Sequence, residues 1–75
     1  MIAGLSDVEE TQKRLGKRVR ELRKERKMSQ GELADRSGLA LMTISRLERG
    51  EHAPNTKTIG QVAEGLGVPI WELLR

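Results

Sequence analysis

Apolar residues recur at helical spacing through most of the chain. In its first third, three of them share one helix face: Leu15, Val19 and Leu22. We expect this helix to last until about Lys27. The stretch SDVE at residues 6–9 has the form of a capping box, which predicts a helix start at Asp7. Residues 1–12 then form either an extension of this helix or a flexible tail.

Two short helices are expected next. A second capping box, SQGE at residues 29–32, opens a helix that ends at Gly38, where glycine suits a left-handed C-cap. A third helix over residues 40–49 ends at Gly50 for the same reason. Two such helices joined by a tight turn are typical of the helix-turn-helix unit, whose second helix can enter the major groove of DNA. An ordinary corner between two helices is the alternative.

The last third of the chain predicts two more helices. Asn55 or Thr56 can cap the fourth, Gly67 ends it, and Pro69 suits the first turn of a short fifth helix. The apolar positions expected to face inward are Ile59, Val62, Ala63, Leu66, Ile70, Leu73 and Leu74. No stretch alternates as a strand does, and no linker divides the chain. Residues 1–75 are therefore expected to form one all-α domain of about five helices.

Composition excludes several classes of function. The chain has no cysteine and one histidine, His52, in a predicted loop, so it offers no disulfide and no histidine- or thiolate-rich metal site. Catalytic triads and phosphate-binding loops are also missing from the sequence. We therefore expect neither an enzyme nor a bound cofactor or metal. Without a signal peptide or an apolar run of about 20 residues, the expected location is the cytoplasm, at the nucleoid, and not a membrane.

Charge is distributed unevenly along the chain. The net charge is +3, but the first 12 residues hold three acidic and no basic residues. The remaining chain has 14 basic against eight acidic residues. This excess favours a polyanionic partner, most simply nucleic acid. The alternative is that the basic residues only solvate helix faces.

Several motifs together resemble one known family. They are RELR in the first helix, SQGELA in the second, TISRLERG in the third and the closing LGV followed by LL. Over residues 15–74 the chain resembles the Cro/C1-type helix-turn-helix family, also called the XRE family. The resemblance implies a compact, lambda-repressor-like bundle of five helices. It also implies a transcriptional regulator, most often a repressor, that binds double-stranded DNA as a homodimer on an inverted-repeat operator.

The third helix supplies the candidates for reading bases. Its expected core positions are Ala40, Ile44 and Leu47, and its expected base-reading positions are Leu41, Met42, Ser45 and Arg46. Arg46 suits a bidentate bond to guanine O6 and N7, with a phosphate contact as the alternative. Leu41 and Met42 suit contact with a thymine C5-methyl group. Alternatively, Leu41 belongs partly to the core and Met42 is an ordinary surface residue. The resemblance implies that many relatives have polar residues at these two positions.

Other residues are candidates for contacting the phosphates of the DNA backbone. They are Gln30, Thr43, Arg49, Asn55 and Lys57. Gln30 opens the second helix, where its amide and nearby backbone N–H groups can meet a phosphate. In the resembled family this glutamine commonly has that role, and the loop near Arg49 and Asn55 grips the backbone. Arg49 and Lys57 can also be solvated surface residues.

Two further predictions concern structure and assembly. On helical wheels, Arg23 and Glu48 border the apolar faces of the first and third helices, and the resembled family commonly has a buried ion pair there. Trp71, the only aromatic residue, is a candidate dimer contact together with Leu74, or else a lid over the core.

A protein-interaction module is the rival function. Antitoxin-like and coactivator-like proteins resemble the same pattern. An exposed Leu41–Met42 pair would suit a protein partner as well as a base.

Overall fold

The computed structural model describes residues 3–51 and 54–75, with the backbone alone for residues 3–6. The described residues form five helices and no strand, which confirms the prediction of an all-α bundle. The helices are α1 (Ala3–Glu25), α2 (Gln30–Ser37), α3 (Leu41–Glu48), α4 (Thr56–Leu66) and α5 (Trp71–Leu74). His52, expected in a loop, lies outside the described residues.

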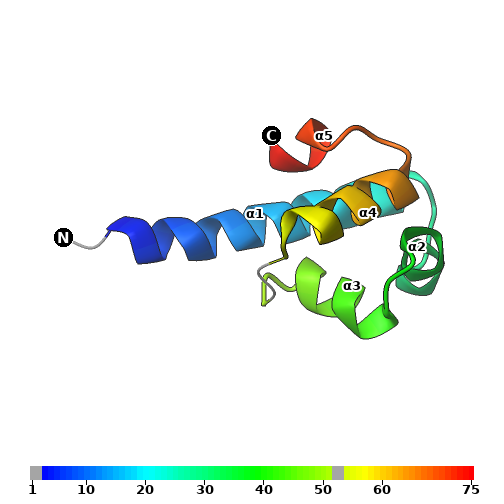
Figure 1. The fold of residues 1–75 in the computed structure, drawn as a ribbon, viewed down its shortest axis with the longest axis horizontal. Coiled ribbons are helices and arrows are strands. Elements are labelled where there is room, and N and C mark those ends of the chain that lie inside the picture. Colours follow the sequence, from blue (N-terminus) through cyan, green and yellow to red (C-terminus); the bar gives the residue numbers. More distant parts are fainter. Residues whose placement is uncertain (1–2, 52–53) are drawn as a thin grey trace.

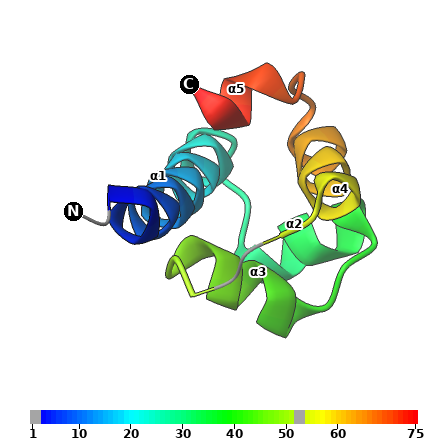
Figure 2. The same ribbon diagram turned by 60° about the vertical axis from the view of Figure 1, so that its left-hand side comes forward.

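The helices surround one apolar core. In Figures 1 and 2, α1 runs along the molecule, α5 folds back over it, and α2 and α3 lie on the opposite side. The start of α1 projects beyond the other helices (Figure 1). Every helix contributes to the core, whose most deeply buried side chains are Val19, Leu33, Ile44, Leu47, Val62 and Leu73. No helix of the described residues is long and apolar enough to cross a membrane.

Caps fix the ends of the short helices. Ser29 Oγ accepts a bond from the Glu32 N–H at 3.0 Å, and the Glu32 carboxylate accepts one from the Ser29 N–H at 2.9 Å. This is the predicted capping box. Hydrogen bonding with Ser29, mainly with its backbone N–H and secondly with its side chain, lowers the pKa of Glu32. Gly38 closes α2 in the left-handed conformation, with φ 68°. Asn55 Oδ1 caps α4 by accepting from the Thr58 N–H at 2.8 Å.

A glycine sets how closely α1 approaches α3. A Cβ at Gly16 would lie 2.8 Å from the Glu48 carbonyl oxygen and would also strike that of Leu47. Both atoms belong to the backbone, so a change of side-chain rotamer cannot relieve the clash. Glycine at this position therefore lets the last turn of α3 rest directly on α1.

The beginning of α1 differs from the prediction. The SDVE stretch does not cap the helix at Asp7, because α1 already includes Ala3 and runs through residues 6–9 without a break. A capping residue has extended backbone angles, and a serine with helix on both sides cannot take that role. Residues 3–12 are thus an extension of α1. At its other end, α1 stops at Glu25, two residues before Lys27, which has a positive φ of 53°.

Three residues that were expected in the core are exposed. Ala40 is the extended N-cap of α3, so it does not follow the wheel of the helix behind it. Ile70 and Leu74 are 41% and 57% exposed, whereas Leu73 is 2% exposed. The short helix expected over residues 69–74 is a single turn, Trp71–Leu74, and it buries one side only.

Candidate nucleic-acid interface

A buried ion pair holds α3 against α1. The guanidinium of Arg23 donates from Nε to Glu48 Oε2 at 2.7 Å and from Nη2 to Oε1 at 3.0 Å. Its Nη1 donates to the carbonyl oxygen of Met28 at 2.8 Å. The side chains of Arg23 and Glu48 are only 10% and 2% exposed. The structure thus brings together the two residues for which the sequence suggested a pair.

Gln30 joins this pair from α2. Its Nε2 donates to Glu48 Oε1 at 3.0 Å, so one carboxylate binds groups from two other helices. The hydrogen bonds that Arg23 donates to Glu48 raise the pKa of Arg23, although burial acts in the opposite direction. The guanidinium of Arg23 therefore stays charged, and its bonds fix the direction of α3 relative to α1 and α2. We call Arg23, Gln30 and Glu48 the clasp.

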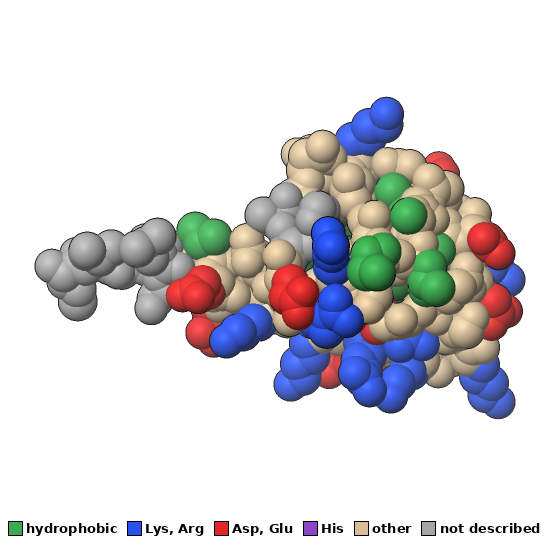
Figure 3. All heavy atoms as spheres, turned by 90° about the horizontal axis from the view of Figure 1, so that it is seen from below, with side chains coloured by type: hydrophobic (Ala, Val, Ile, Leu, Met, Phe, Trp, Pro, Cys, Tyr) green, Lys and Arg blue, Asp and Glu red, His purple; other side chains and the backbone are tan. Residues whose placement is uncertain are grey.

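The face of α3 opposite the core is open. Ile44 and Leu47 are buried, whereas Leu41 and Met42 are 54% and 56% exposed and Arg46 is also exposed. Figure 3 views the molecule from the side on which α3 lies, with apolar side chains in a group and Lys and Arg side chains beside them. The only acidic residue of α3, Glu48, is turned into the clasp. The outer face of α3 consequently combines apolar and positively charged groups.

Ser45 and Arg49 are linked at the end of this face. Arg49 Nη1 donates to Ser45 Oγ at 3.1 Å, and its Nε donates to the Glu51 carboxylate at 2.9 Å. Arg49 and Glu51 are more than half exposed, so their ion pair is weak. A phosphate that approaches Arg49 can therefore compete for its guanidinium.

The remaining predicted backbone contacts lie near the ends of helices. Thr43 is half-buried in α3, and Lys57 is exposed in the first turn of α4. The side-chain oxygen of Asn55 caps α4. The clasp occupies one amide hydrogen of Gln30, which leaves the amide a second hydrogen and its oxygen.

The arrangement of α2 and α3 agrees with a known family. A family model described as "Helix-turn-helix" matches residues 19–73 of the chain. The matched span includes α2, α3 and α4 completely. The chain belongs to the Cro/C1-type helix-turn-helix family.

Repressors are among the relatives of this helix-turn-helix chain. It is 34% identical over 56 residues to the immunity repressor protein of Bacillus phage phi105, covering 75% of this chain and 39% of that protein. It is 42% identical over 55 residues to the HTH-type transcriptional repressor RghR of Bacillus subtilis, covering 72% and 41%. The chain thus spans less than half the length of either repressor.

A solved structure has the same fold. The restriction-modification controller protein C.AhdI from Aeromonas hydrophila superposes with a TM-score of 0.81 at 34% sequence identity. The match covers 83% of this chain and 94% of that one. The fold predicted from the motifs is confirmed by this neighbour together with the family match.

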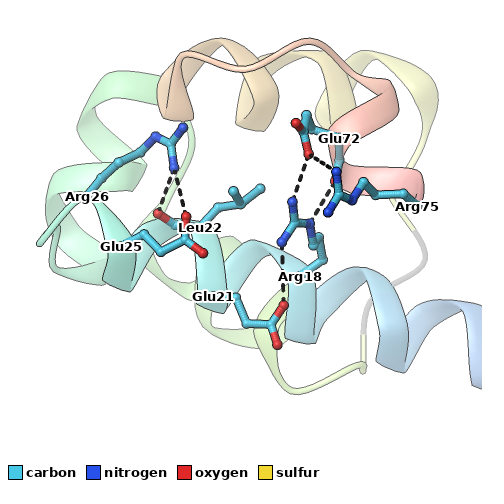
Figure 4. Close-up of polar contacts among 7 residues, drawn as sticks. All are labelled: Arg18, Glu21, Leu22, Glu25, Arg26, Glu72 and Arg75. Atoms are coloured by element: carbon cyan, nitrogen blue, oxygen red, sulfur yellow. Dashed lines mark hydrogen bonds and ion pairs between the residues drawn. The ribbon is translucent and has the colours of Figure 1, made fainter.

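The sequence did not predict one ion-pair network of this helix-turn-helix domain. Figure 4 shows Arg18 of α1 reaching Glu72 of α5, with Arg75 on the same carboxylate. Arg18 donates from Nε to the Glu72 carbonyl oxygen at 2.9 Å and from Nη2 to its Oε1 at 2.7 Å. Arg18 is one of seven basic residues of α1, and Glu72 lies 54 positions away in the sequence. No local pattern distinguishes this arginine from its neighbours.

The network sets the orientation of α5. Trp71 and Leu74 are 60% and 57% exposed, so Trp71 does not lie as a buried lid over the core.

A largely apolar groove of about 500 Å³ lies next to Leu74. Its lining includes Val8 and Leu15 from α1 and Ile59 from α4. The end of α5 and the start of α1 thus form a second apolar surface, away from the clasp.

Proposed function

We propose that this chain is a sequence-specific regulator of transcription, a repressor that binds duplex DNA. The observation that carries the proposal is the outer face of α3, which presents Leu41, Met42 and Arg46 while the clasp holds the helix from behind. A rigid helix of this kind fits the major groove and reads bases mainly with its N-terminal half. No catalytic step, cofactor or metal enters the proposal. Repressors among the relatives support it.

Each side chain has a proposed role in the complex. Arg46 binds guanine O6 and N7, Leu41 and Met42 contact thymine methyl groups, and Ser45 contributes a hydroxyl at a base edge. The proposed phosphate contacts are Gln30, Thr43, Arg49, Asn55 and Lys57. Gln30 then links phosphate binding to the clasp, because its amide bonds Glu48 at the same time. The protein would act where the DNA is, in the cytoplasm at the nucleoid.

The proposal includes a homodimer. One short helix reads only a few base pairs, whereas a two-fold dimer reads two half-sites about one helical turn apart. Trp71 and Leu74 are the proposed contacts, since they are exposed apolar side chains on an α5 that Arg18 holds in place. Aromatic side chains such as that of Trp71 are enriched at protein interfaces.

The test is selection from a randomised duplex pool at about 150 mM salt, followed by sequencing of the bound fraction. The expected result is an inverted repeat whose selected guanine is lost in Arg46→Ala. Arg36→Ala is the matched control, because Arg36 is exposed on α2 and has no assigned role in binding. No enriched sequence, together with weak binding that salt abolishes, would contradict the proposal.

One observation favours a second candidate function. The exposed Leu41–Met42 pair also suits a protein groove, as in an antitoxin-like or coactivator-like interaction module. That candidate predicts a protein partner whose binding is lost in Leu41→Ala. If the module acts on protein alone, Arg46→Ala should leave that binding unchanged and DNA selection should enrich nothing.

A further inference from the structure

We propose that the first turn of α3 recognises the C5-methyl group of a pyrimidine and not the base that carries it. The inference rests on the proposed function and deepens it. Leu41 and Met42 would then bind 5-methylcytosine as well as thymine. Methylation of an operator cytosine at this position would strengthen binding.

The fold gives no reason for two apolar residues here. Leu41 and Met42 are more than half exposed and do not belong to the buried core, which Ile44 and Leu47 supply from the same helix. Leucine and methionine favour helices, but glutamate, lysine and glutamine do so about equally. A ligand with a small apolar group accounts for this pair.

Duplex DNA is the occupant that the surrounding charge favours. Arg46 lies on the same face one turn further along, and Arg49 lies at its end. The charge of the one acidic side chain of α3, Glu48, is compensated by its two bonds to Arg23. Thymine and 5-methylcytosine are the bases that present a C5-methyl group in the major groove of this polyanion. An apolar pair beside arginines therefore matches a methylated pyrimidine in the major groove.

Leu41 and Met42 cannot distinguish the group at the 4-position of the pyrimidine. Thymine presents an O4 acceptor where cytosine presents an N4 donor, and only a hydrogen-bonding side chain tells these apart. Leucine has no such group, and the methionine thioether is a weak acceptor. The neighbouring polar side chains have other proposed contacts, since Thr43, half-buried, is assigned to a phosphate and Ser45 to the edge of another base. Discrimination at this position is thus between methyl and no methyl.

Four versions of one duplex test this inference. Selection is first repeated with the double variant L41A/M42A. The position of interest is a thymine that the parent protein selects and the double variant does not. That base is then replaced in turn by uracil, by 5-methylcytosine and by cytosine, each correctly paired. Thymine and 5-methylcytosine should bind alike. Uracil and cytosine should each bind about fourfold more weakly per half-site, which is the effect of one buried methylene.

The double variant is also the control for changes in DNA shape. Both side chains are exposed, so L41A/M42A should fold as the parent does, and its affinities for the four duplexes should become equal. Equal binding of thymine and uracil, or of cytosine and 5-methylcytosine, by the parent would overturn the methyl inference and leave the proposed function intact. The methyl inference is likewise overturned, with the proposed function intact, if L41A/M42A changes the selection of no thymine in the operator. If selection enriches no sequence at all, the proposed function fails, and the inference fails with it.

Discussion

Arg23 and Glu48 meet between α1 and α3 in a two-bonded pair, with Arg23 Nε 2.7 Å from Glu48 Oε2. Their contact lies behind the helix that is proposed to read DNA. A buried pair of this kind contributes little net stability, because desolvation offsets the attraction. Its effect is on geometry: it ties the end of α3 to the end of α1, and through Gln30 to the start of α2.

Breaking the clasp should be costly. Glu48→Ala leaves the guanidinium of Arg23 buried without its carboxylate and removes the partner of Gln30. The expected loss is about 3–5 kcal/mol in the free energy of unfolding, measured by urea denaturation. Glu51→Ala is the matched control, since its pair with Arg49 is exposed and should contribute less than about 1 kcal/mol. An unchanged unfolding midpoint for Glu48→Ala would show that the clasp does not hold the fold.

The sequence predicted those parts of the fold that depend on local signals. The capping box of Ser29 and Glu32, the left-handed cap at Gly38 and the cap at Asn55 all follow from a few adjacent residues. The wheel also placed Ile44 and Leu47 in the core. These signals succeed because helix ends and helix faces are decided within one or two turns of chain.

The errors occur where a local pattern competes with a longer-range one. The SDVE pattern predicts a cap at its serine, but the helix continues through it to Ala3. The wheel for the last helix failed because α5 has only one turn, which left Leu74 outside. Contacts of Arg18 with Glu72 depend on how α5 folds back over α1, and this was not visible in the sequence. The roles proposed for Arg46 and its neighbours in binding remain predictions.

The crossing of α1 and α3 should tolerate no side chain at Gly16. In Gly16→Ala the new Cβ would press on the carbonyl oxygens of Leu47 and Glu48. We expect a loss of about 1–3 kcal/mol in stability, and weaker operator binding because α3 must shift. Gly60→Ala is the control: it lies within α4, and its Cβ would be 3.8 Å from the nearest side-chain atom, of Ile70. Alanine there should stabilise the domain by about 0.5–1 kcal/mol. Equal effects of the two variants would contradict the close approach.

The capping box of α2 should make stability depend on pH at the acidic end. Its hydrogen bonds lower the pKa of Glu32 in the folded chain below the value in the unfolded chain. The carboxylate therefore stabilises the fold above the ordinary pKa of glutamate, and this contribution is lost as the pH falls through the lowered value. In Glu32→Gln the melting temperature should fall less steeply between about pH 5 and pH 3, because glutamine does not titrate.

Ser29→Ala separates this titration from the cap itself. It keeps the backbone N–H that makes the largest contribution to the shift of Glu32, but removes the hydroxyl that caps α2. We expect it to lower stability by about 1 kcal/mol at all pH values while most of the acid dependence remains. If Glu32→Gln instead keeps the full acid slope, the pH dependence arises elsewhere in the molecule.

Trp71 should matter for assembly more than for folding. It is 60% exposed on α5, and its neighbour Glu72 is anchored to Arg18 by a bond of 2.7 Å. Trp71→Ala should therefore leave the fold intact, as seen in the helical circular dichroism of dilute protein, and should weaken the proposed dimer in sedimentation equilibrium. Met42→Ala is the matched control: it removes a similarly exposed apolar side chain from α3, and the dimer should be unaffected. A dimer that survives Trp71→Ala would place the interface elsewhere, whereas loss of helix at low concentration would mean that Trp71 supports the fold itself.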